Sequence, residues 1–254
     1  MWNPDLYLKF ADQRTRPARD LCAAIPQAAP ARILDLGCGP GNSTQVLRER
    51  WPGARITGLD SSPEMIAKAR ATYPDGDWQV ADLADLATPP CDLLFANAVL
   101  QWLPDHDTLL PRLLARVASG GHLAAQMPTN PRTPLRQAIV EAARHPRFSG
   151  RLTGAGGGLT FLDAPFYQDL LAPLAASLDL WVTTYYHLLA SHQGIVDWFS
   201  STALRPFLER LPDPADQEFF TSEVRMACER AYPLTADGRV LMPFERLFLV
   251  ARAR

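Results

Sequence analysis

Apolar and polar positions alternate in blocks over residues 32–127. Each apolar block has the length of a buried strand, and the blocks between them have the spacing of amphipathic helices. The predicted strands cover 32–36, 54–59, 77–81, 92–96 and 121–127, and the predicted helices cover 43–51, 63–73 and 105–117. Ser62 followed by Pro63 is a typical helix start. The alternation predicts a doubly wound, Rossmann-like α/β sheet of mostly parallel strands.

The pattern changes at both ends of this region. Residues 5–26 are amphipathic, with Tyr7 and Phe10, and predict an N-terminal helix or helix pair. Late strands are predicted over 178–187 and 244–252, one of them antiparallel, separated by helical stretches. The predicted organisation is an N-terminal helical segment or lid over 1–30, a cofactor-binding core over 31–130, helical cap insertions over 131–176 and 190–238, and closing strands over 177–189 and 239–254.

Composition narrows the class of protein. The 254 residues are 47% hydrophobic and 20% charged, which is ordinary for a globular protein with a large core. A net charge of -2 makes nucleic acid a poor partner. The four cysteines form no CxxC pair and no metal pattern, so buried, reduced thiols and no metal are expected. No signal peptide or spanning run is visible, which predicts a cytoplasmic protein, with a monomer favoured.

A glycine loop follows the first strand of the core. Gly37, Gly39 and Gly41 let the backbone turn sharply and approach a ligand. A dinucleotide fingerprint requires Gly or Ala where this chain has Asn42. Asp35, just before the loop, suits an ammonium or sulfonium cation and would repel a pyrophosphate. These features favour S-adenosylmethionine over a dinucleotide.

Acidic residues after the next two strands fit the rest of that cofactor. Asp60 can accept hydrogen bonds from ribose hydroxyls, a role that fits either cofactor. Asp82 can accept from the adenine amine and Leu83 can offer a backbone amide, although Asp82 can also be a turn residue. Met65 can pack on the adenine face or in the core.

Two segments resemble the first two motifs of class I S-adenosylmethionine-dependent methyltransferases: Ile33–Asn42 and Asp60–Met65. Further segments are similar to members that methylate small polycarboxylic acids such as trans-aconitate: 2–4, 95–98, 100–106, 126–128, 183–187 and 204–206. Residues 144–163, which are rich in glycine, depart from that pattern. The resemblance implies a monomethyl ester and S-adenosylhomocysteine as products. It also implies that Gly37, Gly39, Gly41, Asn42, Ser61 and Asn97 contact the cofactor.

A polycarboxylate substrate needs cationic and hydrogen-bonding partners. The candidates are Gln101, Trp102, His106, Tyr186, His187 and Arg205. Each has a structural alternative: Arg205 can form a surface ion pair, His106 can start a helix, and His187 can pack at a strand end. Tyr185 and Tyr186 alternate, so one of them faces the core. A carboxylate is already ionised at neutral pH, so no general base is expected and no residue is assigned a catalytic role beyond positioning.

Two other functions remain open. An NAD(P)-dependent oxidoreductase is disfavoured by Asn42 and by the lack of a Tyr-x-x-x-Lys sequence. A non-catalytic S-adenosylmethionine-binding protein is disfavoured by the candidate substrate residues. Binding of S-adenosylhomocysteine compared with NADH, followed by turnover, separates these three functions.

Overall fold

The computed structural model describes residues 11–26, 29–83, 89–129, 132–148, 150–156, 158–200 and 202–254. The chain divides into two compact units. The core unit comprises Asp12–Thr129, Thr160–Thr183 and Arg246–Arg254, and the helical unit includes Asn130–Leu159 and Thr184–Glu245. The sequence-based division placed 131–176 in a helical cap, whereas residues 160–176 belong to the core unit. Residues 1–10, with Tyr7, Phe10 and the 2–4 segment, lie outside the described residues.

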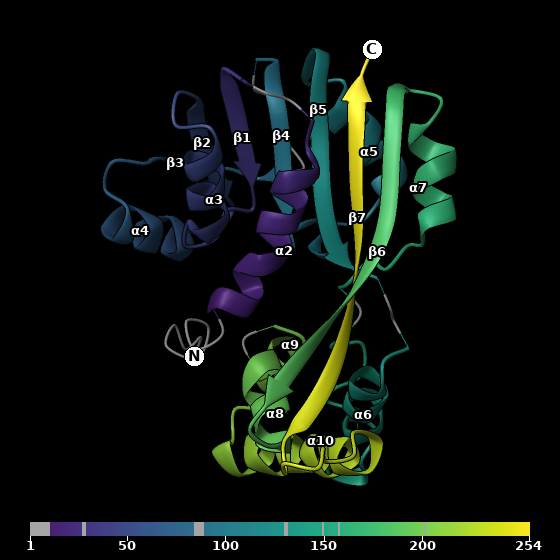
Figure 1. Cartoon of the computed structure of the whole chain (residues 1–254). Helices are drawn as coiled ribbons and strands as arrows, with labels where there is room; N and C mark the ends of the chain where they lie inside the picture. Colours follow the sequence, from purple (N-terminus) through teal and green to yellow (C-terminus); the bar gives the residue numbers. More distant parts are fainter. Residues whose placement is uncertain are drawn as a thin grey trace. The chain divides into compact units, whose positions relative to one another are not determined.

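One seven-stranded sheet has the order β3-β2-β1-β4-β5-β7-β6 (Figure 1). Its strands are β1 Arg32–Leu36, β2 Arg55–Asp60, β3 Asp77–Val80, β4 Cys91–Asn97, β5 Val117–Pro128, β6 Ala175–Leu189 and β7 Val240–Ala253. The pairs among β1 to β5 are parallel, and β7 runs antiparallel to β5. The predicted fold class is therefore confirmed. The strand order reverses between β1 and β4, which is where ligands bind in such sheets.

Helices flank the sheet in the core unit, and in Figure 1 α2 crosses in front of the strands while α5 lies behind them. They are α2 Ala11–Ala24, α3 Asn42–Arg50, α4 Pro63–Thr72, the 3-10 helix η2 Leu100–Trp102, α5 His106–Leu114 and α7 Ala164–Leu171. The predicted cap is confirmed, because Ser62 Oγ accepts a hydrogen bond from Met65 N at the start of α4. Asp163 caps α7 in the same way through Phe166 N.

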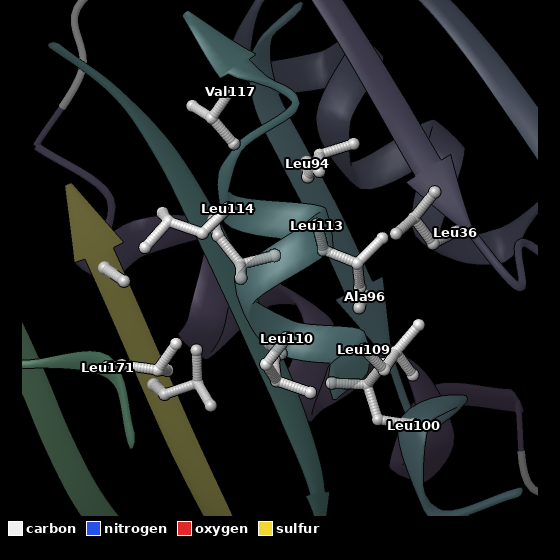
Figure 2. Packing of buried hydrophobic residues seen from close by; sticks show 14 of the residues in the cluster. Leu36, Leu94, Ala96, Leu100, Leu109, Leu110, Leu113, Leu114, Val117 and Leu171 are labelled. Carbon is white, nitrogen blue, oxygen red and sulfur yellow. The ribbon is translucent and has the colours of Figure 1, made fainter. Parts of the chain in front are cut away.

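The core lies between α5 and the sheet. Leu109, Leu110, Leu113 and Leu114 are buried and pack against β1, β4 and β5 (Figure 2). Fully burying a leucine stabilises the fold by roughly 1.5–3 kcal/mol, so this face of α5 fixes the helix firmly. The rigid sheet it covers carries the residues of the candidate site at its carboxyl edge.

The helical unit has an apolar core of its own. Its helices are α6 Pro134–Ala143, the 3-10 helix η3 Pro146–Phe148, α8 His192–Ser200, α9 Arg205–Leu208 and α10 Pro214–Ala231. Asp216 joins two segments of this unit, because it pairs with Arg147 at 2.7 Å and Arg151 at 2.8 Å. These hydrogen bonds lower the pKa of Asp216. Gly157, inside the glycine-rich run, lies outside the described residues.

None of the described helices combines the length and apolar character needed to cross a membrane. No cluster of three or more His, Cys, Asp or Glu in the described part could hold a metal ion. All four cysteines are buried and free of disulfides, as expected from the sequence.

Candidate active site

The glycine loop connects the end of β1 to α3. Gly37, Gly39 and Gly41 all have positive φ, at 63°, 55° and 98°, which glycine adopts at little cost. A Cβ at Gly37 would lie 2.3 Å from Val99 Cγ2, so the segment after β4 packs directly on the loop. A Cβ at Gly39 would have nothing within 4 Å. Gly39 therefore offers backbone to a ligand that approaches closely.

Asp35 lies fully buried beneath this loop. Its Oδ2 accepts hydrogen bonds from Ser43 Oγ at 2.7 Å and Thr44 Oγ1 at 2.6 Å, both on the first turn of α3. Its Oδ1 is buried and has no hydrogen-bond partner. Burial raises the pKa of Asp35 to about 7, against the lowering effect of the two hydroxyls. A cation placed near Oδ1 would compensate this desolvated acid.

Asp60, at the end of β2, forms hydrogen bonds with the glycine loop and with the start of α4. Its two oxygens accept from Gly39 N and Ser62 N, both at 2.9 Å. The carboxylate therefore joins the glycine loop to the start of α4. Each oxygen accepts one of these bonds and so keeps a lone pair that can accept from a ribose hydroxyl, and Asp60 is only partly buried. Ser61, which follows Asp60, is exposed. Asn42, which follows the glycine loop, is the first residue of α3.

Two of the predicted adenine contacts, Asp82 and Leu83, follow the end of β3, and the third, Met65, lies on α4. Ala81 N donates to Asp60 O at 3.0 Å and brings this segment beside Asp60. Asp82 is exposed and Met65 is half-buried, whereas the Leu83 side chain is buried in the core cluster. An adenine contact by Leu83 would therefore use its backbone. Residues 84–88, which follow directly, lie outside the described residues.

The end of β4 carries a turn that a non-glycine residue adopts rarely. Asn97 is followed by Ala98, whose φ is 57°. Ala98 N donates to Gln126 O at 2.9 Å, and Gln126 Nε2 donates to Asn97 Oδ1 at 2.5 Å. Gln126 Oε1 in turn accepts from Arg246 Nη1 at 2.9 Å. Both Gln126 and Arg246 are buried, and neither was predicted as a site residue.

The 3-10 helix η2 presents Gln101 and Trp102 next to this turn. Gln101 Nε2 donates to Ala98 O at 2.7 Å, while its Oε1 is buried without a hydrogen-bond partner. Trp102 is 43% exposed, which leaves its ring available to a ligand. Thr160 N donates to Gln101 O and Thr160 Oγ1 to Leu103 O, both at 2.8 Å. Thr160 thereby holds η2 in place.

His106 is buried, and both of its ring nitrogens have partners. Nε2 lies 2.9 Å from Leu100 O, and since a carbonyl only accepts, Nε2 carries the proton. Nδ1 lies 2.7 Å from the hydroxyl of Tyr167, a buried residue of α7. Through its hydrogen bond to Leu100 O, His106 holds η2 in place. A direct substrate contact by His106 stays a prediction.

The remaining candidates lie in the helical unit. Tyr186 is 64% exposed and Tyr185 is buried, so the alternation along β6 is as expected. His187 is buried and its ring centroid lies 4.5 Å from that of Trp198. Arg205, at the start of α9, pairs with Glu209 at 2.7 Å across one helical turn. The candidates thus fall into two groups, one in each unit: Gln101, Trp102 and His106 in the core unit, and Tyr186, His187 and Arg205 in the helical unit.

Sequence reasoning missed the polar pair behind Asn97. Gln126 lies within the apolar run 123–127, and a polar residue at a buried strand position was the available signal. Arg246 gave no such signal, because Glu245 and Arg246 form a charged pair before the apolar run 247–251, whereas in the structure Arg246 lies in the middle of β7. Ser43 and Thr44 were also missed, although their place at the start of a helix after the glycine loop could have indicated partners for Asp35.

Comparisons with known proteins agree on one family. A family described as a methyltransferase domain matches residues 7–211. A trans-aconitate 2-methyltransferase of Methylobacterium nodulans is 53% identical over 99% of this chain and 98% of its own length. A trans-aconitate 2-methyltransferase of Escherichia coli is 46% identical, again over 99% of this chain and 98% of the relative.

Solved structures with low sequence identity share the fold. The YcgJ protein from Bacillus subtilis aligns with a TM-score of 0.61 at 11% identity, over 94% of this chain and 99% of that one. Phosphoethanolamine N-methyltransferase 2 of Haemonchus contortus, in complex with phosphomonomethylethanolamine and S-adenosylhomocysteine, aligns with a TM-score of 0.59 at 14% identity. That alignment covers 94% of this chain and 53% of the nematode chain.

Proposed function

The chain belongs to the methyltransferase domain family, with trans-aconitate 2-methyltransferases among its relatives, and we propose its reaction from this membership. The protein transfers the methyl group of S-adenosylmethionine to one carboxylate of a small polycarboxylic acid, trans-aconitate. The products are a monomethyl ester and S-adenosylhomocysteine. The trans-aconitate 2-methyltransferases align with almost the whole chain, so the sequence similarity includes both units.

The buried, unpartnered Oδ1 of Asp35 carries the proposal for the donor site. A buried carboxylate oxygen with no hydrogen bond is costly unless a ligand completes it. The donor bears an ammonium and a sulfonium, and either suits this position better than a phosphate does. Asp60 and the open backbone at Gly39 fit the ribose and the thioether chain of the same molecule. The described residues therefore fit S-adenosylmethionine at the carboxyl ends of β1 and β2.

The reaction requires the protein mainly to position the donor and the acceptor. A carboxylate with a pKa near ~4 is already ionised at neutral pH, so no side chain needs to remove a proton. The carboxylate oxygen forms the new bond to the methyl carbon as the carbon–sulfur bond breaks, and the electron pair returns to sulfur. Placing the reacting atoms in line at roughly 3 Å supplies most of the rate enhancement. Loss of the donor's positive charge also favours a site with few water molecules.

We propose acid-binding roles for the candidates of the core unit and for those of the helical unit, each group taken by itself. Gln101 and Trp102 lie beside the donor site in the core unit, on the helix η2 that Thr160 and His106 support. Arg205 offers the bidentate geometry that carboxylates favour, and Glu209 neutralises it until an acid takes its place. Tyr186 and His187 stay in the proposal as further contacts. The cytoplasmic location and monomeric state remain predictions, and light scattering on the purified protein tests the second.

Transfer of labelled methyl from S-adenosylmethionine tests this proposal. The acids compared are trans-aconitate, cis-aconitate, isocitrate and citrate, with the methylated carboxylate identified by NMR of the product. We expect one base-labile monomethyl ester, formed fastest from trans-aconitate. Tight S-adenosylhomocysteine binding without turnover of any acid would favour a non-catalytic binding protein. Preference for NADH over S-adenosylhomocysteine would refute the donor site itself.

A further inference from the structure

Three polar side chains form a continuous hydrogen-bonded row across the carboxyl edge of the sheet. Arg246 Nη1 donates to Gln126 Oε1 at 2.9 Å, and Gln126 Nε2 donates to Asn97 Oδ1 at 2.5 Å. Arg246 is 6% exposed and Gln126 is 0% exposed, so the row starts in the interior. Asn97 is only partly buried. The row therefore runs from a buried cation on β7, through β5, to a surface-accessible amide at the end of β4.

The chemistry of the row fixes the direction of each amide. A guanidinium has five donors and no acceptor, so the group that Gln126 turns toward Arg246 must be its oxygen. The amide nitrogen of Gln126 then faces Asn97, which must answer with its own oxygen. The Nδ2 group of Asn97 consequently points away from the row. In the described part of the chain Asn97 Nδ2 has no hydrogen-bond partner, so its two N–H groups are available to a ligand.

The place of Asn97 shows which ligand lies within reach. Ala96 pairs with Leu36 in the β1–β4 register, so Asn97 is level with Gly37, the first glycine of the loop. Two residues later, Val99 packs on Gly37 itself. Ala98 adopts its left-handed conformation between them, held by its bond to Gln126 O. Asn97 thus stands beside the donor loop and next to the helix η2 that carries Gln101.

We propose that Arg246 is a positioning residue that acts through Gln126 to hold Asn97 with its amide N–H groups toward a carboxylate in the active site. This inference rests on the proposed function, because it needs a bound carboxylate. Two carboxylates are chemically suitable, the α-carboxylate of the donor and the carboxylate of the acid. An ionised carboxylate accepts from two N–H groups and offers none, so it would be repelled by the opposite amide orientation.

A double-mutant cycle between Arg246→Met and Asn97→Ala tests the row. If Arg246 acts through Asn97, each single change weakens carboxylate binding by about tenfold or more, and the double variant is no weaker than Asn97→Ala alone. Arg246→Lys keeps a cation that can only donate, so it should restore most of the affinity. Effects of Arg246→Met and Asn97→Ala that multiply in the double variant would show independent action and overturn the inference.

Gln126→Glu is a second variant, in case Arg246→Met fails to fold. Glutamate can accept from both Arg246 and Asn97, so Asn97 must turn its nitrogen inward and its oxygen toward the ligand. We expect a larger loss of carboxylate affinity from Gln126→Glu than from Asn97→Ala, with the circular dichroism spectrum retained. An equal or smaller loss would contradict the amide orientation on which the inference depends.

The choice of probe identifies the carboxylate. S-adenosylhomocysteine has an α-carboxylate and 5′-methylthioadenosine has none, so a loss confined to the former places Asn97 on the donor. A raised KM for trans-aconitate with unchanged S-adenosylhomocysteine affinity and little change in kcat places it on the acid. Loss of affinity for 5′-methylthioadenosine as well would show a general structural defect and overturn the inference. Turnover by the unaltered protein is measured first, because its absence refutes the proposed function and not the row.

Discussion

Replacement of Asp35 by asparagine separates two effects of this buried acid: it lowers the free energy of unfolding, and it favours binding of a cationic ligand. Asn has nearly the same shape, and its oxygen can accept from Ser43 and Thr44 as Oδ2 does. It has no charge to desolvate. Because burial raises the pKa of Asp35 to about 7, the folded protein binds this proton more tightly than the unfolded chain, in which an aspartate has a pKa near ~3.9. The free energy of unfolding of the unaltered protein therefore carries a penalty from Asp35 that grows as the pH rises between these two values.

The magnitude follows from the width of that window. Each pH unit inside it changes the free energy of unfolding by about 1.36 kcal/mol. Between pH 5 and pH 8 the window covers about two units, so the unaltered protein should lose roughly 3 kcal/mol relative to Asp35→Asn. Urea unfolding of both proteins at these two pH values gives the difference directly. All other titrating groups are shared by the two proteins, so they cancel to first order.

Ligand binding should show the opposite preference. A cation near Oδ1 stabilises the ionised form, so S-adenosylmethionine should bind the unaltered protein more tightly at pH 8 than at pH 6. Asp35→Asn should bind it weakly at both. Calorimetry in buffers of different ionisation enthalpy would detect the proton released on binding. A stability difference between the two proteins that does not change with pH would refute the reasoning, because Asp35 would then titrate normally.

Three further changes test separate parts of the molecule. Asp60→Ala should weaken S-adenosylhomocysteine binding by tenfold or more in calorimetry, since it removes a ribose acceptor and the hydrogen bonds from Gly39 N and Ser62 N. Asp77→Ala, which removes a carboxylate at the opposite end of β3, should leave this binding unchanged. Arg205→Ala should raise the KM for trans-aconitate by about tenfold or more without altering S-adenosylhomocysteine affinity. Glu209→Gln, which frees Arg205 from its ion pair, should not raise this KM. An equal loss of affinity for the acid and for S-adenosylhomocysteine in Arg205→Ala would make Arg205 a structural residue. Leu110→Ala should lower the free energy of unfolding by about 2–5 kcal/mol in urea titrations, because this side chain is fully buried between α5 and the sheet, and a change below about 1 kcal/mol would mean that the core relaxes around it.

The core unit could be predicted from sequence because its signals are local. Apolar runs of strand length, the Ser62 cap and the glycine loop each depend on neighbouring residues, and the strands and the α4 cap appear at the predicted positions within a few residues. The segment 160–176 was placed in the helical cap because its helical pattern resembles the one before it. This segment belongs to the core unit because Tyr167 and Leu171 pack in the core cluster on the sheet, and such long-range packing leaves no local signal in the sequence.

The environment of the site residues was harder to predict. Asp35 was found from its place before the loop, but its unpartnered oxygen depends on how Ser43 and Thr44 fold back onto it. Arg246 and Gln126 are 120 residues apart in the chain, and only the antiparallel pairing of β7 with β5 brings them together. No short-range pattern encodes that contact. His106 shows the same limit, because its partner Tyr167 comes from α7.

A crystal structure with S-adenosylhomocysteine and trans-aconitate tests the central claim most directly. We expect the donor product on the Gly37–Gly41 loop, its ribose on Asp60 and its ammonium toward Asp35. One carboxylate oxygen of the acid should lie in line with the sulfur, with room for a methyl group between them. Side chains filling the space at the carboxyl ends of β1 and β4, with the nucleoside bound elsewhere, would contradict the claim.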